Sequence, residues 1–380
     1  MQLVSVVAFI ILSVFIGYTV AGYPLILGWL ARRDARPVDK RFEPRTVSFV
    51  IAVYNGADFL ADKLRSILGL DYPRELMEVV VVSDESTDAT DDIARSFAGE
   101  GVKLIRVPRG GKPAALNIAV PQTSGEILVL TDVRQTLERE SVRRMIACFG
   151  DPTVGVVSGD LVIRKGDIEE TNVGLYWRYE RWIRKQLGRV DSMMGATGPF
   201  YAMRRALFRP MPKDLLLDDM YVPLGAFFAG YRLIVEEEAR AFDYPTGVET
   251  EFRRKVRTLA GNYQLMRYLP ELLSSRNRML FHYLSYKLAR LLLPWAVLAL
   301  GVVSFGLPRF WREAALAAQA LFYLLALTDF AAGPGTLWKR ISSPARTVVS
   351  LLAATACAVA IFFVPAQKLW KPTQLARRSG

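Results

Sequence analysis

Cysteine and histidine are almost absent from this chain, which has two cysteines and one histidine among its 380 residues. Two thiols cannot form a disulfide framework or a four-ligand zinc site, and Cys148 and Cys357 both lie in apolar stretches. The single His282 excludes any metal motif that needs paired histidines, and it is the one candidate for a Ser-His-Asp triad. These counts exclude a disulfide-rich scaffold and a His-pair metal site.

The sequence also lacks the patterns of a nucleic-acid-binding protein, although its formal net charge is +12. It has no zinc-finger spacing, and its 49 lysines and arginines are spread along the chain. They are densest beside apolar segments, as at Arg32, Arg33, Arg36, Lys40 and Arg41 and again at Lys339, Arg340 and Arg346. Anionic lipid and a small anionic substrate explain this distribution better than DNA does. We therefore expect membrane lipids, and no nucleic acid, among the partners.

Long apolar runs mark both ends of the chain, which is 52% hydrophobic with a mean hydropathy of +0.20. Residues 3–30 carry no charge and are long enough to span a bilayer. No basic residue precedes them, so an uncleaved membrane helix is favoured over a signal peptide. The basic cluster at 32–41 places the following segment in the cytoplasm by the positive-inside rule. Three further apolar spans lie near 288–307, 314–333 and 344–364.

These runs divide the chain into five segments. We predict a transmembrane helix at 1–30, a cytoplasmic α/β domain at 31–250, amphipathic interface helices at 251–287, about three transmembrane helices at 288–364 and a basic tail at 365–380. One plus three spans would put the basic tail outside, against the positive-inside rule. The alternative is that one C-terminal segment is re-entrant or interfacial.

Within the α/β domain, short β-branched runs alternate with segments of helical period. The predicted strands are 47–53, 78–83, 102–107, 127–132 and 154–158. Runs that are apolar on both faces are typical of a parallel sheet covered by helices on each side. Ligands of such sheets bind beyond the carboxyl ends of the strands, so the polar residues after each strand are the candidates for a site.

Three of these strand ends carry side chains suited to a nucleotide. Tyr54 follows the first strand, where an aromatic ring can lie against a planar base. Asp84 ends the second strand, where a carboxylate can accept hydrogen bonds from a base or a ribose. After the third strand, Gly110-Gly111-Lys112 opens a helix, and a lysine beside free backbone N–H groups suits a pyrophosphate.

Asp132 ends the fourth predicted strand, and Arg134 follows two positions later. Two carboxylates at this place would hold a divalent cation against a diphosphate. Because the chain has one acid there, two alternatives remain. Either Mg²⁺ or Mn²⁺ binds at Asp132, or the Arg134 guanidinium neutralises phosphate charge without a metal.

Three later motifs complete the candidates. The adjacent acids Asp218 and Asp219 repel each other, which suits one of them to act as a general base, with a helix N-cap as the alternative. The loop 195–200 has two glycines that let a bulky ligand approach the backbone. The basic stretch 253–257 suits either anionic lipid or a departing diphosphate.

In this order the motifs resemble those of membrane-integrated family 2 glycosyltransferases, the relatives of hyaluronan, cellulose and poly-N-acetylglucosamine synthases. The resemblance covers roughly residues 46–262. It implies a GT-A (Rossmann-like) domain inserted between transmembrane helices, a nucleotide-sugar donor and inversion at the anomeric carbon.

The resemblance also implies roles for individual residues. By this resemblance, Tyr54 and Asp84 contact the uracil base of the donor. Lys112 and Arg257 contact its diphosphate, and Asp132 is the first acid of the Asp-x-Asp motif. Asp219 matches the general base of the Thr-Glu-Asp motif, with Asp218 beside it. The residues that correspond to the acceptor-binding part of the site are Gly195, Thr197, Gly198 and Arg254.

Two departures bear on function. Arg134 replaces the second acid of Asp-x-Asp, which puts the Mg²⁺ or Mn²⁺ site in question. Arg254 and Thr258 replace the Gln and Trp of the Gln-x-x-Arg-Trp motif, and that Trp supports the acceptor in polymerising relatives.

We therefore expect an inverting transferase that moves a sugar from a UDP-sugar to a polysaccharide, oligosaccharide or lipid hydroxyl at a bacterial inner membrane. The alternatives are single-sugar transfer of the ceramide or polyprenyl-phosphate glucosyltransferase kind, and a non-catalytic nucleotide-sugar-binding membrane protein.

Overall fold

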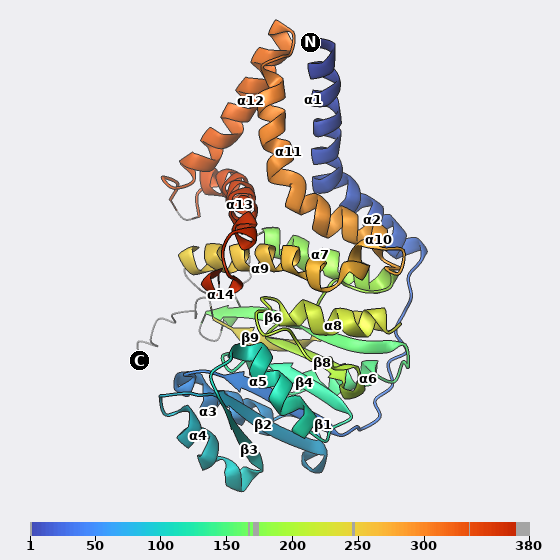
Figure 1. Cartoon of the computed structure of the whole chain (residues 1–380), viewed down its shortest axis with the longest axis vertical. Coiled ribbons are helices and arrows are strands. Elements are labelled where there is room, and N and C mark those ends of the chain that lie inside the picture. The colour runs from blue at the N-terminus through green and yellow to red at the C-terminus, as the bar shows by residue number, and fades with distance from the viewer. Residues whose placement is uncertain (1, 166–167, 170–174, 245–247, 334, 370–380) are drawn as a thin grey trace. The chain divides into compact units, whose positions relative to one another are not determined.

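The computed structural model describes residues 2–165, 168–169, 175–244, 248–333 and 335–369 (Figure 1). The chain forms two compact units. The sheet unit comprises Arg33–Val173 and Arg184–Pro245, and the helical unit comprises Met1–Arg32, Gly174–Ile183 and Thr246–Gly380.

The sheet unit is built on a nine-stranded sheet in the order β3-β2-β1-β4-β8-β6-β9-β5, with β7 paired to β6. The first four strands of this order are parallel to one another: β3 (Val102–Val107), β2 (Met77–Asp84), β1 (Val47–Val53) and β4 (Ile127–Thr131). The residues of β1, β2 and β4 are almost all buried, as continuous apolar runs predict for strands covered on both faces, whereas the edge strand β3 exposes Lys103 and Arg106.

The other half of the sheet is mixed. Strand β8 (Phe200–Arg204) lies between β4 and β6 (Val154–Lys165) and is antiparallel to both. Strand β9 (Arg232–Asp243) is parallel to β6, while β5 (Thr136–Leu137) and β7 (Ile168–Glu169) are short antiparallel edge strands. The expectation of a parallel sheet is therefore wrong for this half. An apolar run indicates a buried strand, but it does not specify the direction of that strand.

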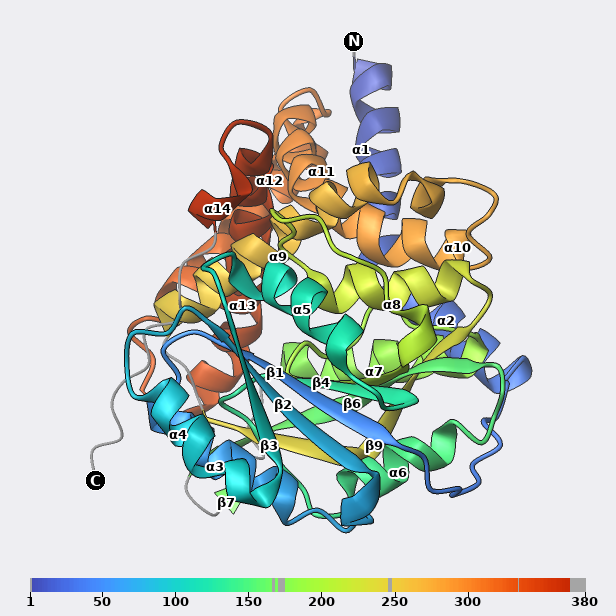
Figure 2. The same ribbon diagram turned by 60° about the horizontal axis from the view of Figure 1, so that its bottom comes forward.

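Helices cover both faces of the parallel half. The connections β1-α3-β2 and β2-α4-β3 run one way across the sheet and β3-α5-β4 runs back, so right-handed crossovers put α5 on the opposite face from α3 and α4 (Figure 2). The helices of the unit are α3 (Ala57–Leu68), α4 (Thr90–Ser96), α5 (Gly111–Ala119), α6 (Ser141–Cys148) and α8 (Asp218–Phe228), with short 3-10 turns at Arg74–Leu76, Ala98–Glu100, Val120–Gln122 and Arg205–Leu207. Helix α7 (Leu175–Val190) belongs to both units.

In the described part of the chain, four helices are long and apolar enough to cross a membrane: Gln2–Arg33, Leu280–Ser304, Arg309–Thr328 and Leu337–Phe362. The first joins α1 (Gln2–Gly17) to α2 (Tyr23–Arg33) through a π-helical turn. The second joins α10 (Leu280–Tyr283) to α11 (Ala289–Ser304) through a second π-helical turn, so it begins at Leu280 rather than at 288. The last two consist of α12 (Arg309–Thr328) and of α13 (Leu337–Ala358) with a 3-10 end.

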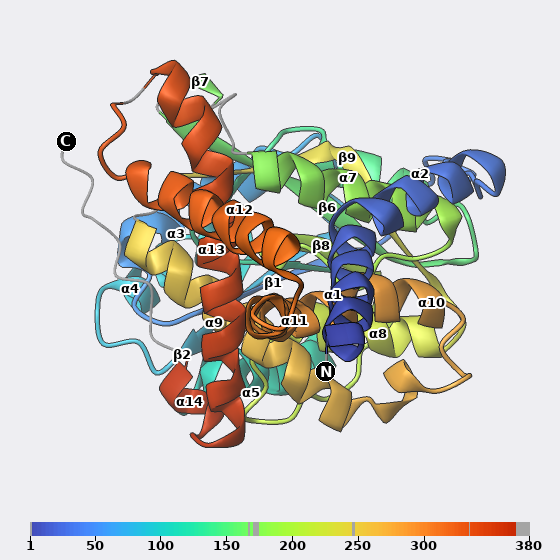
Figure 3. The same ribbon diagram turned by 90° about the horizontal axis from the view of Figure 1, so that it is seen from above.

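The packing within the helical unit places α1 beside α11 and α13 against both α12 and α9 (Val248–Tyr268) (Figure 3). The predicted interface segment 251–287 consists of α9, a 3-10 turn at Pro270–Leu273 and the start of the second long helix. Of the predicted tail, 366–369 form α14 (Ala366–Leu369), and 370–380 lie outside the described residues.

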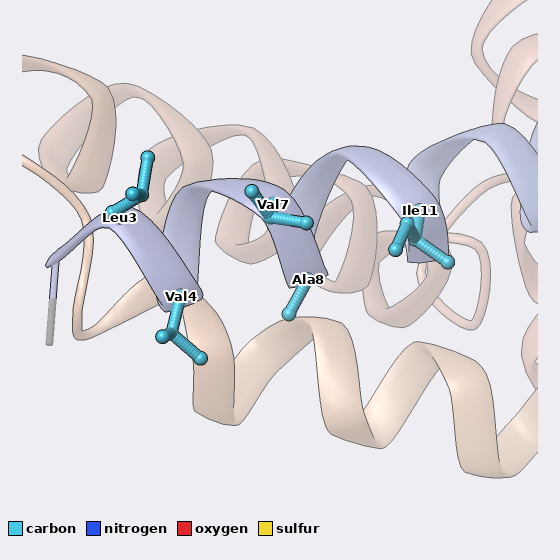
Figure 4. Close-up of a pocket in the computed structure, with 5 residues that line it drawn as sticks. All are labelled: Leu3, Val4, Val7, Ala8 and Ile11. Carbon is cyan, nitrogen blue, oxygen red and sulfur yellow. The ribbon is translucent and has the colours of Figure 1, made fainter.

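The long helices expose apolar side chains that a lipid bilayer would cover. Leu3, Val4, Val7, Ala8 and Ile11 line an apolar groove on α1 (Figure 4), and Leu3 and Val4 are 76% and 72% exposed. An apolar surface of this extent is costly in water, and a hydrocarbon environment removes that cost.

Candidate active site

The carboxyl ends of β1, β2 and β4 meet at one edge of the sheet, because these strands are parallel neighbours. The predicted residues Tyr54, Asp84 and Asp132 stand directly after or at these three ends. The glycine turn that opens α5 lies next to them, since its amides bond to Asp84.

The Asp84 carboxylate holds this glycine turn in place. Its Oδ1 accepts a hydrogen bond from the Gly110 N–H at 2.7 Å, and its Oδ2 accepts one from the Gly111 N–H at 3.0 Å. It also forms an ion pair with the guanidinium of Arg109. Gly111 has a φ of +80°, a conformation that favours glycine. The predicted contact between Asp84 and a base stays a prediction.

The side chains of Arg109 and Tyr54 stack beside this turn and form a flat surface. The Arg109 guanidinium lies 3.6 Å from the ring centroid of Tyr54. A guanidinium stacked on an aromatic ring forms a cation–π contact, and either face can stack against a planar base. The sequence analysis missed Arg109, whose position directly before the glycine turn was the available signal.

Lys112 links two motifs that are far apart in the sequence. Its Nζ lies 2.8 Å from Oδ1 of Asp132 and 2.9 Å from Oδ2 of Asp218. Burial lowers the pKa of Lys112, but the two carboxylates outweigh burial and hold that pKa well above its usual value. The ammonium group is therefore charged at every physiological pH. It joins the strand end of β4 to the first turn of α8.

The two adjacent acids open α8. The N-cap of this helix is Leu217, so neither Asp218 nor Asp219 occupies the capping position that was the alternative prediction. Carboxylates in the first turn are favoured by the helix dipole.

The loop 195–200 packs directly against Asp219. The backbone N–H of Ala196 donates to the Asp219 carbonyl at 2.7 Å. A Cβ atom at Gly198 would lie only 2.9 Å from Oδ2 of Asp219, so only glycine leaves that carboxylate its observed position. Gly195 has a φ of +128°, which again favours glycine.

The same loop is also fixed to the strand end that carries Asp132. Thr197 donates its backbone N–H to Ser158 Oγ at 2.8 Å, and the two hydroxyls lie 3.0 Å apart. The Pro199 carbonyl accepts from the Asp132 N–H at 3.2 Å and from the Thr131 hydroxyl at 2.8 Å. The loop thus lies between the predicted donor acid and the predicted base.

Two buried residues of this region were missed. Tyr201 is fully buried, and among the described residues its hydroxyl has no hydrogen-bond partner. Burial raises the pKa of Tyr201 well above its usual value, and the nearby Asp218 adds to this rise. The hydroxyl therefore stays protonated and can donate a hydrogen bond. No sequence signal distinguishes this tyrosine from other buried residues of a strand.

The second missed residue is Lys63 on α3, which is also fully buried. Its Nζ donates to Thr131 Oγ1 at 2.6 Å and to the Gln135 carbonyl at 2.7 Å, on either side of the segment 132–134. Burial lowers the pKa of Lys63 to about 7. Its place on the buried stripe of α3, beside Leu60 and Leu64, was a signal in the sequence.

The side chain of Arg134 forms an ion pair with a buried carboxylate. Its guanidinium pairs with Asp243 on β9, whose side chain is 1% exposed, and Gln135 donates to the same carboxylate at 2.9 Å.

The donor motif offers a divalent metal ion one carboxylate, that of Asp132. At nucleotide sites Mg²⁺ is held by one or two carboxylates together with phosphate oxygens and water. Among the described residues, no three Asp, Glu, His or Cys side chains converge on one point. The acid predicted to bind the ion, Asp132, is already paired with Lys112.

The remaining predicted residues, Arg254 and Arg257, lie on α9 in the helical unit. Arg254 pairs with Glu251 at 3.1 Å on the same helix. Their predicted contacts to acceptor and diphosphate stay predictions.

A family model described as Glycosyl transferase family 2 matches residues 48–211. Among solved structures, the mannosyltransferase PcManGT from Pyrobaculum calidifontis, in complex with GDP-Man and Mn²⁺, has a TM-score of 0.72 and 24% identity, and the match covers 94% of this chain and 99% of that one. The predicted GT-A fold is therefore confirmed, with the correction to the strand directions described above.

Curated relatives are similar over part of their length. The probable glycosyltransferase YdaM of Bacillus subtilis is 24% identical over 62% of this chain, and the poly-beta-1,6-N-acetyl-D-glucosamine synthase of Staphylococcus epidermidis is 23% identical over 58%. The beta-monoglucosyldiacylglycerol synthase of Nostoc sp. is 28% identical over 39% of this chain. The match spans 60%, 55% and 34% of these relatives, respectively.

Proposed function

Residues 48–211 are a family 2 glycosyltransferase domain, and from this premise we propose that the protein transfers a sugar from a nucleotide-sugar to an acceptor hydroxyl at a membrane. One observation carries the proposal: Lys112 pairs with both Asp132 and Asp218, so the donor motif and the adjacent acids belong to one site. A protein that only bound a nucleotide-sugar would not need a carboxylate that can act as a general base beside the donor.

The donor lies along the strand ends in this proposal. The base stacks on the surface formed by Tyr54 and Arg109, and the diphosphate takes the Lys112 ammonium as its cation. A UDP-sugar is the first choice because the sequence motifs resemble those of UDP-sugar enzymes. GDP-sugars are tested beside it, since the structurally similar mannosyltransferase was solved with GDP-Man.

Asp219 is the general base of the proposed reaction. Its carboxylate takes the proton of the acceptor hydroxyl while that oxygen forms a bond to C1 of the sugar. The bond between C1 and the diphosphate oxygen breaks on the opposite face, so the configuration at C1 inverts. The electron pair leaves with the diphosphate, and the fixed charge of Lys112 stabilises it. Asp218 pairs with Lys112, which supports its neighbour Asp219 as the general base in this proposal.

The acceptor is a lipid or a saccharide hydroxyl. Relatives are named for synthesis of a glycolipid and of a polysaccharide, and four helices in the described part of this chain are apolar enough to lie in a membrane. The replacement of Trp by Thr258 favours single-sugar transfer over polymerisation. The basic cluster at 32–41 favours a cytoplasmic sheet unit at a bacterial inner membrane.

The test is nucleotide release by the detergent-purified full chain, with UDP-, GDP- and dTDP-sugars as donors and membrane lipid extract as acceptor. We expect release from one donor. Asp219→Asn is expected to lower the rate about 100-fold or more while nucleotide binding persists. NMR of the product gives the anomeric configuration and tests inversion.

The matched control is Asp92→Asn, which removes a carboxylate whose side chain is 82% exposed. It should release nucleotide at the wild-type rate. Equal rates in Asp219→Asn and wild type would show that another group is the base. Nucleotide binding without release, in the presence of lipid extract, would favour the non-catalytic alternative.

A further inference from the structure

We propose that this protein binds the donor diphosphate without a divalent metal ion, using Lys112 as the cation of the site. The inference rests on the proposed function, because it concerns the same donor site. The family resemblance leads one to expect Mg²⁺ or Mn²⁺ here, and the side chains present argue against it.

The first argument is the charge around Asp132. Its Oδ1 lies 2.8 Å from the Lys112 ammonium, which also reaches Asp218 at 2.9 Å. A metal ion on the other carboxylate oxygen of Asp132 would lie close to this ammonium. Two positive groups at such a distance repel strongly where water is scarce, and the Lys112 side chain is only 26% exposed.

The second argument is the residue at the second position of the motif. Arg134 cannot ligate a cation, and its guanidinium pairs with the buried Asp243. Gln135 and the Tyr244 N–H also donate to Asp243, so this carboxylate is committed to holding the segment. Asp243 therefore serves as the counter-ion of Arg134 and is not a spare ligand for a metal.

The third argument is a second lysine behind the segment. Lys63 Nζ donates to Thr131 and to the Gln135 carbonyl, which flank the segment 132–134. It is buried within the sheet unit and interacts electrostatically with Asp132. The single charge of Asp132 thus faces two lysines.

Lys112 itself is suited to bind a diphosphate. It lies in the first turn of α5, where the helix dipole favours an anion, while the N–H groups of Gly110 and Gly111 are already bonded to Asp84. The ammonium has three N–H donors and two carboxylate partners, Asp132 and Asp218, so a diphosphate can accept the third hydrogen bond without displacing either carboxylate.

The test measures binding of UDP and of GDP to the purified full chain after treatment with EDTA, with and without added Mn²⁺. We expect the affinity for the nucleotide that binds to change less than about threefold, well below the tenfold that 1.4 kcal/mol represents. Tightening by about tenfold or more on addition of Mn²⁺ would overturn this inference and leave the proposed function intact. Failure of both nucleotides to bind in either condition would overturn both.

A pair of double variants tests the role of residue 134 directly. Arg134→Asp with Asp243→Asn supplies the second acid and removes the buried carboxylate that would otherwise repel it. Arg134→Asn with Asp243→Asn is the matched control, since it loses the same ion pair without gaining an acid. We expect Mn²⁺ to tighten nucleotide binding in the first and not in the second. Manganese independence in both would overturn the assignment of this role to Arg134.

Discussion

Gly198→Ala would add one methyl group directly against the proposed base. The new Cβ would lie 2.9 Å from Oδ2 of Asp219, with the Cγ and Cβ atoms of that residue at 3.4 and 3.5 Å. The backbone of Gly198 is outside the left-handed region, so alanine can adopt it. The obstacle is the end of a side chain, which can turn away at little cost to folding. The variant should therefore fold normally with a displaced carboxylate.

The size of the displacement follows from the contact distances. Ordinary contact with a Cβ begins at 3.4 Å, so Oδ2 of Asp219 must move from 2.9 Å by about 0.5 Å. A misplacement of about 1 Å can lower a rate about 100-fold, so half that distance predicts about a tenfold loss. The affinity for the donor nucleotide should stay unchanged, because Gly198 contacts the proposed general base Asp219 and not Lys112.

The assay compares the turnover number for sugar transfer, the nucleotide affinity and the melting temperature of Gly198→Ala and wild type. The matched control is Gly99→Ala, where the added methyl group would meet no atom within 4 Å. It should leave all three quantities unchanged. Wild-type turnover in Gly198→Ala would refute the reasoning that the observed position of Asp219 is the reactive one. A large fall in melting temperature would refute the claim that the strain is confined to its side chain.

Two further predictions concern the residues that the sequence analysis missed. Burial lowers the pKa of Lys63 to about 7. Between pH 7 and the usual pKa of lysine, the unfolded chain therefore binds more protons than the folded one. The free energy of unfolding rises with pH in this range. Lys63→Met removes this dependence. Between pH 6 and pH 9, the free energy of unfolding measured from thermal melts should rise by about 2 kcal/mol more for wild type than for the variant. An equal change in both proteins would contradict the lowered pKa of Lys63. Arg109→Ala removes the stack on Tyr54 and the ion pair with Asp84, and fluorescence titration should show nucleotide binding weakened about tenfold. Unchanged affinity would exclude this surface from the base site.

The local pattern of the sequence was enough to predict much of the architecture. The strand 47–53 was predicted with the bounds that the structure has, because a buried strand between two helical segments is an uninterrupted apolar run. The four helices of the described residues that are long and apolar enough to cross a membrane followed from length and hydropathy in the same way. The order of the motifs along the chain then identified the glycosyltransferase domain that the family model matches.

The pairing of side chains was decided only by the tertiary structure. The sequence left Arg134 as a possible phosphate ligand, since nothing in it brings β9 and Asp243 to the segment that carries Arg134. It could not show that Lys112 lies between Asp132 and Asp218, or that Lys63 is buried beneath that segment. Periodicity records which face of one element is buried. The partner of a charged group depends on which elements become neighbours, and distant segments of the chain become neighbours only in the folded sheet, as β8 does beside β4.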